Sequence, residues 1–334
     1  MHQRLRSSFQ MVLSLAIGVS VLGTQAMAQT DSVNQTKATE SPTFRVPKTP
    51  QNKSSEVPKV AKRLSNNNDA NPKAAPAAPA APAAPAAPKH PLDRAVSIAE
   101  EALGRMRREV NDYTAILVKR QRINGELSPT TYMGAKIRCP RRDESGVETP
   151  FSIYMRFMRP AKVAGREVIW VDGKDDNKAW VHEGAGAPLL RWKSFLLEPT
   201  STIMMIGQRE PVYEAGLENL IIKLIEKAER DRAAGMCVVN YRDGATINKR
   251  SCSVIELIHE DQRAPYEFHK AQVFIDDELG LPIRFAAYDW PSAPGEQPEL
   301  IEEYTYVNIK VNVGLKDSDF DPRNPTYKFK SLPN

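Results

Sequence analysis

The sequence predicts an α+β domain that is mostly antiparallel β-sheet, and three observations lead to this fold class. Apolar residues recur at three- and four-residue steps between Leu92 and Val110, which is the spacing of an amphipathic helix. About ten short alternating or apolar runs, separated by turn residues, follow to the C-terminus, as an antiparallel sheet requires. A second helical stripe between Leu217 and Ala228 interrupts these runs.

Each element has a local reason. Both helices carry charged residues opposite their apolar stripes, so one face of each packs on a core. The pairs Asn124-Gly125 and Asp243-Gly244 favour tight turns between strands. The predicted strands are 113–123, 131–138, 151–158, 167–171, 178–182, 189–194, 236–241, 252–259, 270–275, 281–288 and 300–313.

The first 28 residues have the pattern of a secretory signal peptide. Arg4 and Arg6 precede an uncharged, mostly apolar run over 9–23, and 26–28 then read Ala-Met-Ala, a small-x-small cleavage pattern. The apolar run is too short to span a bilayer comfortably. We therefore expect a mature chain that begins at Gln29, has no transmembrane segment, and is exported to the periplasm or cell envelope of a bacterium.

Residues 29–90 are predicted to be a disordered linker rich in Pro and Ala, because they contain few aromatic or large aliphatic residues to bury. Residues 74–88 repeat Ala-Ala-Pro five times, which favours a stiff polyproline II arm of about 45 Å. The linker has a net charge of +5, whereas 91–334, the predicted folded domain, has 35 basic against 37 acidic residues. The tail is either a solvated spacer or a contact to an anionic envelope or cell-wall surface, and this distribution excludes a nucleic-acid partner.

The strands from 151 onward are unusually apolar on one face. Alternate residues of 151–158 are large and apolar, each of the three strands that follow contains a Trp, and 203–206 adds unbranched Met side chains. These side chains are either ordinary core or the lining of a cavity for an acyl chain, and the sequence leaves both interpretations open. The candidate ligand-cavity residues are Phe151, Ile153, Met155, Phe157, Trp170, Trp180, Trp192, Met204, Met205, Leu220 and Leu224.

The sequence contains no recognisable catalytic motif. It lacks a nucleophile elbow, a phosphate loop, a dinucleotide fingerprint and a His-Glu-x-x-His motif. The histidines of the domain, His182, His259 and His269, do not have metal-ligand spacing. We therefore expect no enzymatic activity, no catalytic residue, no metal site and no cofactor.

The chain has three cysteines, an odd number for an oxidising compartment. Cys237 and Cys252 lie on two runs that a turn near Gly244 would pair, and equal offsets from that turn could set them opposite each other. A disulfide there, which would stabilise the fold by about 3 kcal/mol, and two free thiols are both open. Cys139 would be left single.

Several segments resemble known families. The stretch 275–284, Ile-Asp-Asp-Glu-Leu-Gly-Leu-Pro-Ile-Arg, resembles the strand, turn and strand signature of periplasmic lipoprotein carriers. Residues 92–329 resemble a secreted bacterial family catalogued as domain of unknown function 1571, with matching segments at 164–168, 302–306 and 319–325. The resemblance implies an incomplete antiparallel barrel, or half-barrel, wrapped around two or three helices with an apolar cavity between them.

Three hypotheses of function follow. The first is a non-enzymatic envelope protein that binds a lipid, an acyl chain or an acylated protein in that cavity. The second is a structural or protein-binding envelope module without a small-molecule ligand. The third is a hydrolase whose motif is not recognisable. Fold alone does not decide between them.

Overall fold

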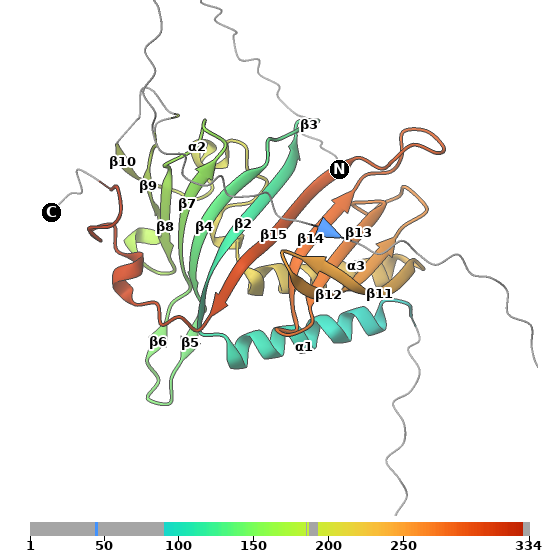
Figure 1. Cartoon of the computed structure of the whole chain (residues 1–334), viewed down its shortest axis with the longest axis horizontal. Helices are drawn as coiled ribbons and strands as arrows, with labels where there is room; N and C mark the ends of the chain where they lie inside the picture. The colour runs from blue at the N-terminus through green and yellow to red at the C-terminus, as the bar shows by residue number, and fades with distance from the viewer. Residues whose placement is uncertain (1–43, 46–89, 185, 187–192, 330–334) are drawn as a thin grey trace, which may run out of the picture. The chain divides into compact units, whose positions relative to one another are not determined.

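The computed structural model describes residues 44–45, 90–184, 186 and 193–329 (Figure 1). The predicted signal peptide lies outside the described residues, and so does the predicted linker except for 44–45 and 90. The predicted core domain, in contrast, is described nearly throughout.

The helices are α1 (Asp93–Glu109), α2 (Thr202–Met205) and α3 (Leu217–Ala234), and short 3₁₀ turns occur at Asp175–Asn177, Val212–Glu214 and Asp317–Phe320. The strands are β1 (Phe44–Arg45), β2 (Asp112–Ile123), β3 (Glu126–Leu127), β4 (Thr131–Arg138), β5 (Arg141–Arg142), β6 (Glu148–Thr149), β7 (Ser152–Arg159), β8 (Glu167–Val171), β9 (Ala179–His182), β10 (Ser194–Leu197), β11 (Val238–Ile247), β12 (Arg250–Ile258), β13 (Lys270–Asp276), β14 (Leu281–Tyr288) and β15 (Leu300–Val311). Three predicted strands, β4, β8 and β14, are confirmed to the residue.

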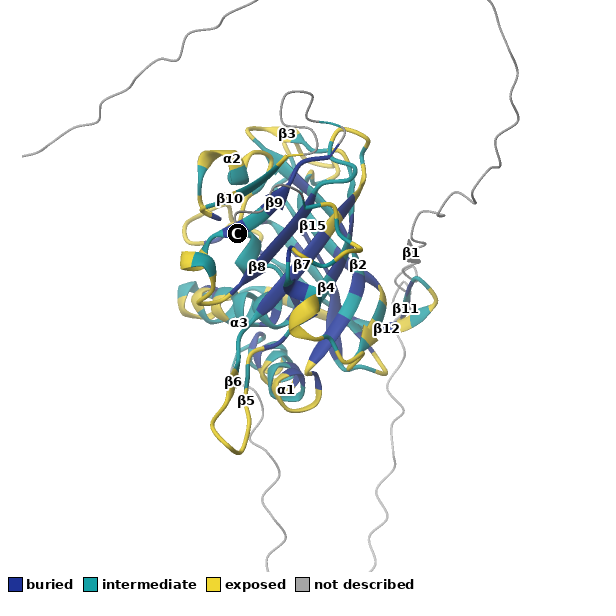
Figure 2. Ribbon diagram, turned by 90° about the vertical axis from the view of Figure 1, so that its left-hand side faces the viewer, coloured by how far each residue is buried: buried dark blue, intermediate teal, exposed yellow. Residues whose placement is uncertain are grey.

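Within the described residues, 13 strands form one antiparallel sheet in the order β1-β11-β12-β13-β14-β15-β2-β4-β7-β8-β9-β10, with β3 added to β2. The sheet is open, because its end strands β1 and β10 do not pair with each other. The β5–β6 hairpin is separate from this sheet and projects from it, largely exposed (Figure 2). The predicted fold class, α+β and mostly antiparallel, is thus confirmed.

Both predicted long helices are confirmed, and they cover one face of the sheet. α1 buries Val96, Ala102 and Met106, and α3 buries Leu217 and Ile221. The two helices contact each other, and both contact β14 (Figure 1). Each helix therefore forms because its apolar stripe has a partner, as amphipathic helices need.

Strand alternation divides the core between the two faces of the sheet. On β7, Ile153, Met155 and Phe157 join the main core on the helix side, whereas Tyr154 lies on the opposite face. The segment after β15 covers that opposite face, where Tyr154 stacks on Tyr327 with ring centroids 4.1 Å apart. The helix-side face is therefore the one that can hold a site between layers.

The predicted turn at Asp243-Gly244 is wrong. β11 continues through these residues with a bulge between Arg242 and Ala245, and the chain reverses at 248–249 instead. The longer strand places Ala245 and Ile247 in a second buried cluster on the sheet. Burial of these two side chains outweighs the local turn preference, since a bulge absorbs the extra residue.

The carrier-like signature forms the turn between β13 and β14. The Asp276 carboxylate, 1% exposed, accepts hydrogen bonds from Arg250 and from the backbone N–H groups of Glu278 (3.0 Å) and Leu279 (2.9 Å). Burial works to raise the pKa of Asp276, but these donors hold it below its usual value. In this chain the signature therefore has a structural role, which is to fix a tight turn.

Candidate functional site

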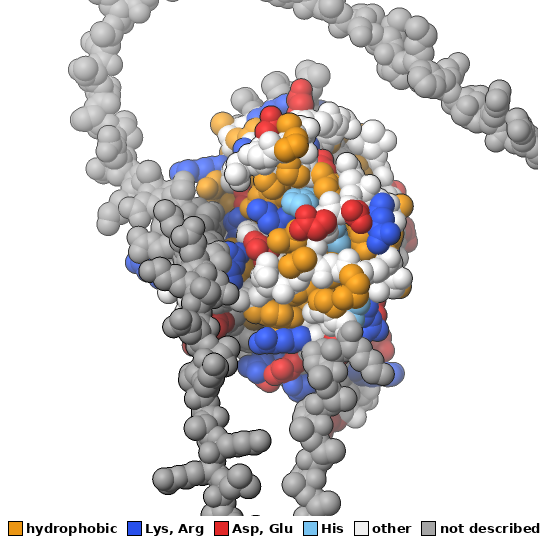
Figure 3. All heavy atoms as spheres, turned by 90° about the vertical axis from the view of Figure 1, so that its right-hand side faces the viewer, with side chains coloured by type: hydrophobic (Ala, Val, Ile, Leu, Met, Phe, Trp, Pro, Cys, Tyr) orange, Lys and Arg blue, Asp and Glu red, His pale blue; other side chains and the backbone are white. Residues whose placement is uncertain are grey.

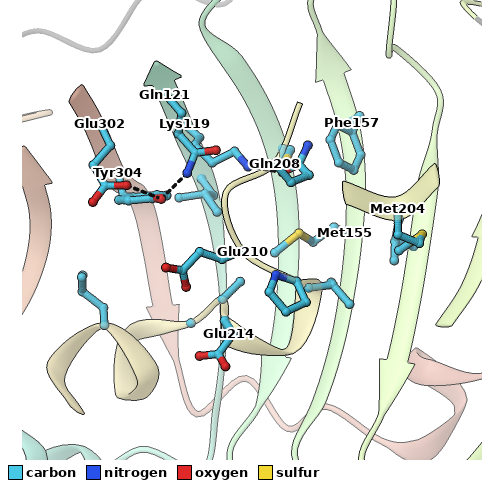
Figure 4. A pocket seen from close by; sticks show the side chains of 18 of the residues that line it. Lys119, Gln121, Met155, Phe157, Met204, Gln208, Glu210, Glu214, Glu302 and Tyr304 are labelled. Atoms are coloured by element: carbon cyan, nitrogen blue, oxygen red, sulfur yellow. Dashed lines mark hydrogen bonds between the residues drawn. The ribbon is translucent and has the colours of Figure 1, made fainter. Parts of the chain in front are cut away.

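A cavity of about 140 Å³ lies between the helix-side face of the sheet and the segment that runs from α2 into α3 (Figure 4). An engineered apolar cavity of about 150 Å³ accepts benzene, so this one has room for a hydrocarbon segment of roughly six carbons. The exposed Ile203 of α2 lies at its rim. Most of the lining is apolar and includes Leu117, Met133, Met155, Phe157, Val168 and Met204.

One side of the cavity is polar. Lys119 and Gln121 on β2 share the face of Leu117, because alternate residues of a strand point the same way. The register pairs Gln121 with Glu302 and Lys119 with Tyr304 on β15, so the four side chains converge (Figure 4). They lie opposite the Met155 and Phe157 side of the cavity, which makes the cavity amphipathic.

These polar groups are connected by hydrogen bonds. The Tyr304 hydroxyl donates to Glu302 Oε2 at 3.1 Å and accepts from Gln121 Nε2. The Lys119 ammonium donates to Gln208 Oε1, an amide oxygen on the segment after α2. Burial lowers the pKa of Lys119 to about 8, and the negative charge of Glu302 offsets part of this effect.

Ion pairs surround the cavity. Arg209 lies 3.3 Å from Glu302, and Lys223 lies 3.3 Å from Glu214 and also contacts Glu210. Such half-exposed pairs contribute little to stability. Their consequence is a polar rim around an apolar interior.

Two tyrosine hydroxyls close the cavity where α3 begins. Tyr113 Oη accepts from the Leu217 N–H at 2.7 Å, and Tyr306 Oη accepts from the Gly216 N–H at 3.1 Å. The first N–H groups of a helix have no partner within the helix, so these hydroxyls satisfy them in a buried position. Gly216 has φ of 121° and a Cβ there would lie 3.4 Å from Tyr113 Oη, so this approach favours glycine.

We expect Tyr113→Phe to lower the free energy of unfolding by about 1–3 kcal/mol, because it leaves the buried Leu217 N–H without an acceptor. Urea unfolding of both proteins measures this difference. Tyr241→Phe is the matched control, since the Tyr241 hydroxyl has no hydrogen-bond partner within the described residues. Equal stabilities of Tyr113→Phe and the parent chain would contradict the proposed helix cap.

A second cavity of about 70 Å³ adjoins the first. It lies between α1, α3 and strands β12–β14, and its lining is almost entirely apolar. Leu224, Lys227 and Phe285 line both cavities. The two cavities are therefore neighbours, with these three side chains between them.

The structure brings some of the predicted cavity residues together and separates others. Met155, Phe157, Met204, Leu220 and Leu224 line the larger cavity. Ile153 is completely buried core, Met205 is half-buried beside the cavity, and Phe151 and Trp170 pack together with ring centroids 6.0 Å apart. Trp180 pairs with Ile169, so it lies on the opposite face from Trp170, and Trp192 lies outside the described residues.

Sequence reasoning missed the polar side of the cavity. Lys119, Gln121, Glu302 and Tyr304 lie on long strands whose polar residues read as solvent-facing. A signal was present, because Lys119 and Gln121 continue the alternation that buries Tyr113 and Leu117. That alternation predicts polar side chains on the covered face of the sheet.

Of the two possibilities left open for Cys237 and Cys252, the structure has free thiols. All three cysteines are free, and Cys252 is paired with Ala245. Cys237 precedes β11, at the far end of the hairpin, because the chain reverses at 248–249 rather than at Asp243-Gly244. Burial raises the pKa of Cys237 to about 11 and those of Cys139 and Cys252 to about 12, so all three are protonated at neutral pH.

His259 is almost completely buried. His259 Nε2 lies 3.5 Å from Asp231 Oδ2, and its ring stacks on Tyr266 with centroids 3.9 Å apart. Its Nδ1 is 3.0 Å from the Phe268 carbonyl oxygen. These contacts attach the loop after β12 to α3, which is a structural role.

Among the described residues, no group of three or more His, Cys, Asp or Glu side chains is arranged to hold a metal ion. No helix in the described part of the chain is long and apolar enough to cross a bilayer.

Several solved structures are similar to the chain. A DUF1329 family protein from Desulfovibrio piger is 13% identical, with 70% of this chain and 98% of that one covered and a TM-score of 0.33. In the MucA/MucB complex of Pseudomonas aeruginosa, the matching chain is 14% identical, with 68% of this chain and 60% of that one covered and a TM-score of 0.38. A LolA superfamily protein from Nitrosomonas europaea is 12% identical, with 67% of this chain and 96% of that one covered and a TM-score of 0.26. At this level of similarity, nothing about activity transfers to this chain.

No curated protein matches the chain. A family model described as a protein of unknown function, DUF1571, matches residues 110–329. This match spans β2 to the segment after β15, which includes both cavities apart from their α1 side. The chain therefore belongs to the DUF1571 family.

Proposed function

We propose that this protein is a non-enzymatic component of the cell envelope that binds an acyl chain, of a lipid or of an acylated protein, in the two adjoining cavities. In this proposal the open sheet acts as a half-barrel around α1 and α3. The observation that carries the proposal is the mostly apolar cavity of about 140 Å³ beside a second one of about 70 Å³ that shares Leu224 with it.

The hydrophobic effect is large enough for such binding. Together the cavities accommodate roughly nine methylene groups by comparison with the benzene-sized cavity above. At about 0.8 kcal/mol per buried methylene, they contribute about 7 kcal/mol, which corresponds to a Kd on the order of 10 µM. Ordering of the ligand weakens this value, so additional contacts at the rim are needed for tighter binding.

The composition of the cavity supports a binding role over a catalytic one. Among the described residues, its lining contains no serine, threonine, cysteine or histidine. It therefore lacks the Ser, Thr or Cys nucleophile with a His base that many acyl hydrolases use. Its four glutamates, Glu183, Glu210, Glu214 and Glu302, are held in ion pairs with Arg166, Lys223 and Arg209. An unrecognised hydrolase remains the third hypothesis, but no arrangement of groups in this cavity favours it.

The N-terminal segments complete the proposal. Export through the 1–28 signal peptide would place the domain in the envelope, and the 29–90 linker would act as a spacer with a positive charge. The described atoms visible on the β11–β13 side of the domain mix hydrophobic, basic and acidic side chains, with no continuous basic stripe (Figure 3). This mixture gives no support for nucleic-acid binding by this side of the domain.

The test is displacement of a fluorescent fatty acid from the delipidated mature chain. We expect saturable binding in the micromolar range and at least a tenfold loss in Met204→Glu, which places a charge in the apolar cavity. Thr202→Glu on the same helix is the matched control, because Thr202 is exposed and does not line the cavity.

Absence of any binding of the fatty acid, together with a ligand-free mass for protein purified from its own cells, would contradict an acyl-binding role. A specific protein partner captured in the same preparation, with no lipid, would favour the protein-binding module instead.

A further inference from the structure

The lysines and arginines around the cavity differ in their partners. Arg166 pairs with Glu183 at 3.1 Å. Lys223 pairs with Glu210 and Glu214, and Lys227 with Glu267. Among the described residues, Lys119 is the one cation in the cavity lining that has no carboxylate in ion-pair contact, and its acceptor is the neutral Gln208 amide.

The carboxylate that influences Lys119 most is already occupied. Glu302 is held by Arg209 at 3.3 Å and by the Tyr304 hydroxyl at 3.1 Å. Removal of an ammonium group from water is costly unless an opposite charge and hydrogen bonds compensate for it. The pKa of Lys119 is lowered because burial disfavours its charged form and no carboxylate pairs with it directly.

A second buried group points to the same place. Gln121 is 2% exposed, lines the cavity two residues beyond Lys119, and uses its Nε2 to donate to Tyr304. Its Oε1 is buried without a hydrogen-bond partner among the described residues. Buried amide oxygens are nearly always paired, so this acceptor favours a hydroxyl or amide donor beside the anion.

We infer that Lys119 is the anion-binding group of the cavity, so that the ligand is an amphiphile whose carboxylate or phosphate head group pairs with Lys119 while its acyl chain enters the apolar side. This inference rests on the proposed function and adds the chemistry of the head group. Figure 4 shows the arrangement, with Lys119, Gln121 and Gln208 apart from Met155 and Met204. A charge-assisted contact in this partly desolvated position is stronger than one in water.

The experiment compares dodecanoic acid, its methyl ester and dodecyl phosphate as competitors of a fluorescent fatty acid on the full mature chain. At pH 7 we expect the acid or the phosphate to bind at least tenfold more tightly than the ester. Lys119→Met should abolish this difference, whereas Lys119→Arg should retain it. Lys310→Met, an exposed lysine on the neighbouring β15, is the matched control.

The pH dependence of ligand affinity separates the contribution of the Lys119 charge from that of its packing. Glu302 and Tyr304 on β15 and Glu210 after α2 lie around Lys119 in Figure 4, and Arg209 pairs with Glu302. Burial raises the pKa of Tyr304, so its hydroxyl stays neutral. Affinity for the acid should fall as the pH rises above about 8, where Lys119 loses its proton, and should stay constant in Lys119→Met. Thermal unfolding of each variant verifies that the protein is folded.

The outcomes are distinguishable. A preference for the phosphate over the acid would support the inference and assign a phospholipid-type head group, and the reverse would assign a fatty-acid carboxylate. Equal affinities of acid, phosphate and ester for the parent chain, or a preference that survives in Lys119→Met, would overturn the inference while the acyl-binding proposal stands. Failure of all three to bind would overturn the acyl-binding proposal itself.

Discussion

Leu224→Trp is expected to lower the affinity for long acyl chains by roughly fiftyfold more than it lowers the affinity for short ones. Leu224 lines both cavities, so a larger side chain there closes the passage from the first into the second. The second cavity, about 70 Å³, holds roughly three methylenes, which contribute about 2–3 kcal/mol. Competition by fatty acids of six to sixteen carbons measures this dependence on chain length.

The same position allows the opposite change. Leu224→Ala should merge the two cavities and raise the affinity for long chains relative to short ones. Glu226→Trp introduces the same indole on an exposed position of α3 and is the matched control. An identical chain-length profile for Leu224→Trp, Leu224→Ala and the parent would mean that a bound chain does not pass Leu224.

Arg250→Met is expected to lower the free energy of unfolding by about 3 kcal/mol, because it leaves the carboxylate of Asp276 buried without its cation. Arg250 donates to both carboxylate oxygens of Asp276 and also pairs with Glu278 at 2.9 Å. Since Asp276 is only 1% exposed, water cannot replace the lost contact. Urea unfolding at pH 7 measures the loss.

Two further measurements separate the buried charge from lost packing. The double variant Arg250→Met with Asp276→Asn removes the charge as well and should recover part of the stability. The pKa of Asp276 is depressed in the folded protein, so its contribution is present above the unfolded pKa and disappears as the pH falls through the folded value. In Arg250→Met the folded pKa rises, and acid unfolding should therefore begin at a higher pH. An unchanged acid transition would contradict the role assigned to this pair.

Local pattern determined most of the elements. α1 and α3 follow from apolar stripes, and β4, β8 and β14 from alternation bounded by turn residues, because these signals depend only on residues close in sequence. The carrier-like signature at 275–284 was also interpretable, since Asp276 and Gly280 form a turn whose hydrogen bonds are local. The turn between β11 and β12 could not be predicted locally, because burial of Ala245 and Ile247 against distant strands decides where it lies. The turn expected at Asp243-Gly244 is also what made a Cys237–Cys252 pairing possible on paper.

By itself, the sequence determined a largely antiparallel domain with one apolar strand face, and five of its eleven candidate residues line the larger cavity. Only the tertiary structure decided which side chains meet there. Met155 and Phe157 face α3, whereas Trp180 turns away, because the register with β8 sets its face. The pairing of β2 with β15 brought Lys119 and Gln121 beside Glu302 and Tyr304, residues about 180 positions apart. Contacts over such separations depend on strand register and helix placement, which no local period encodes.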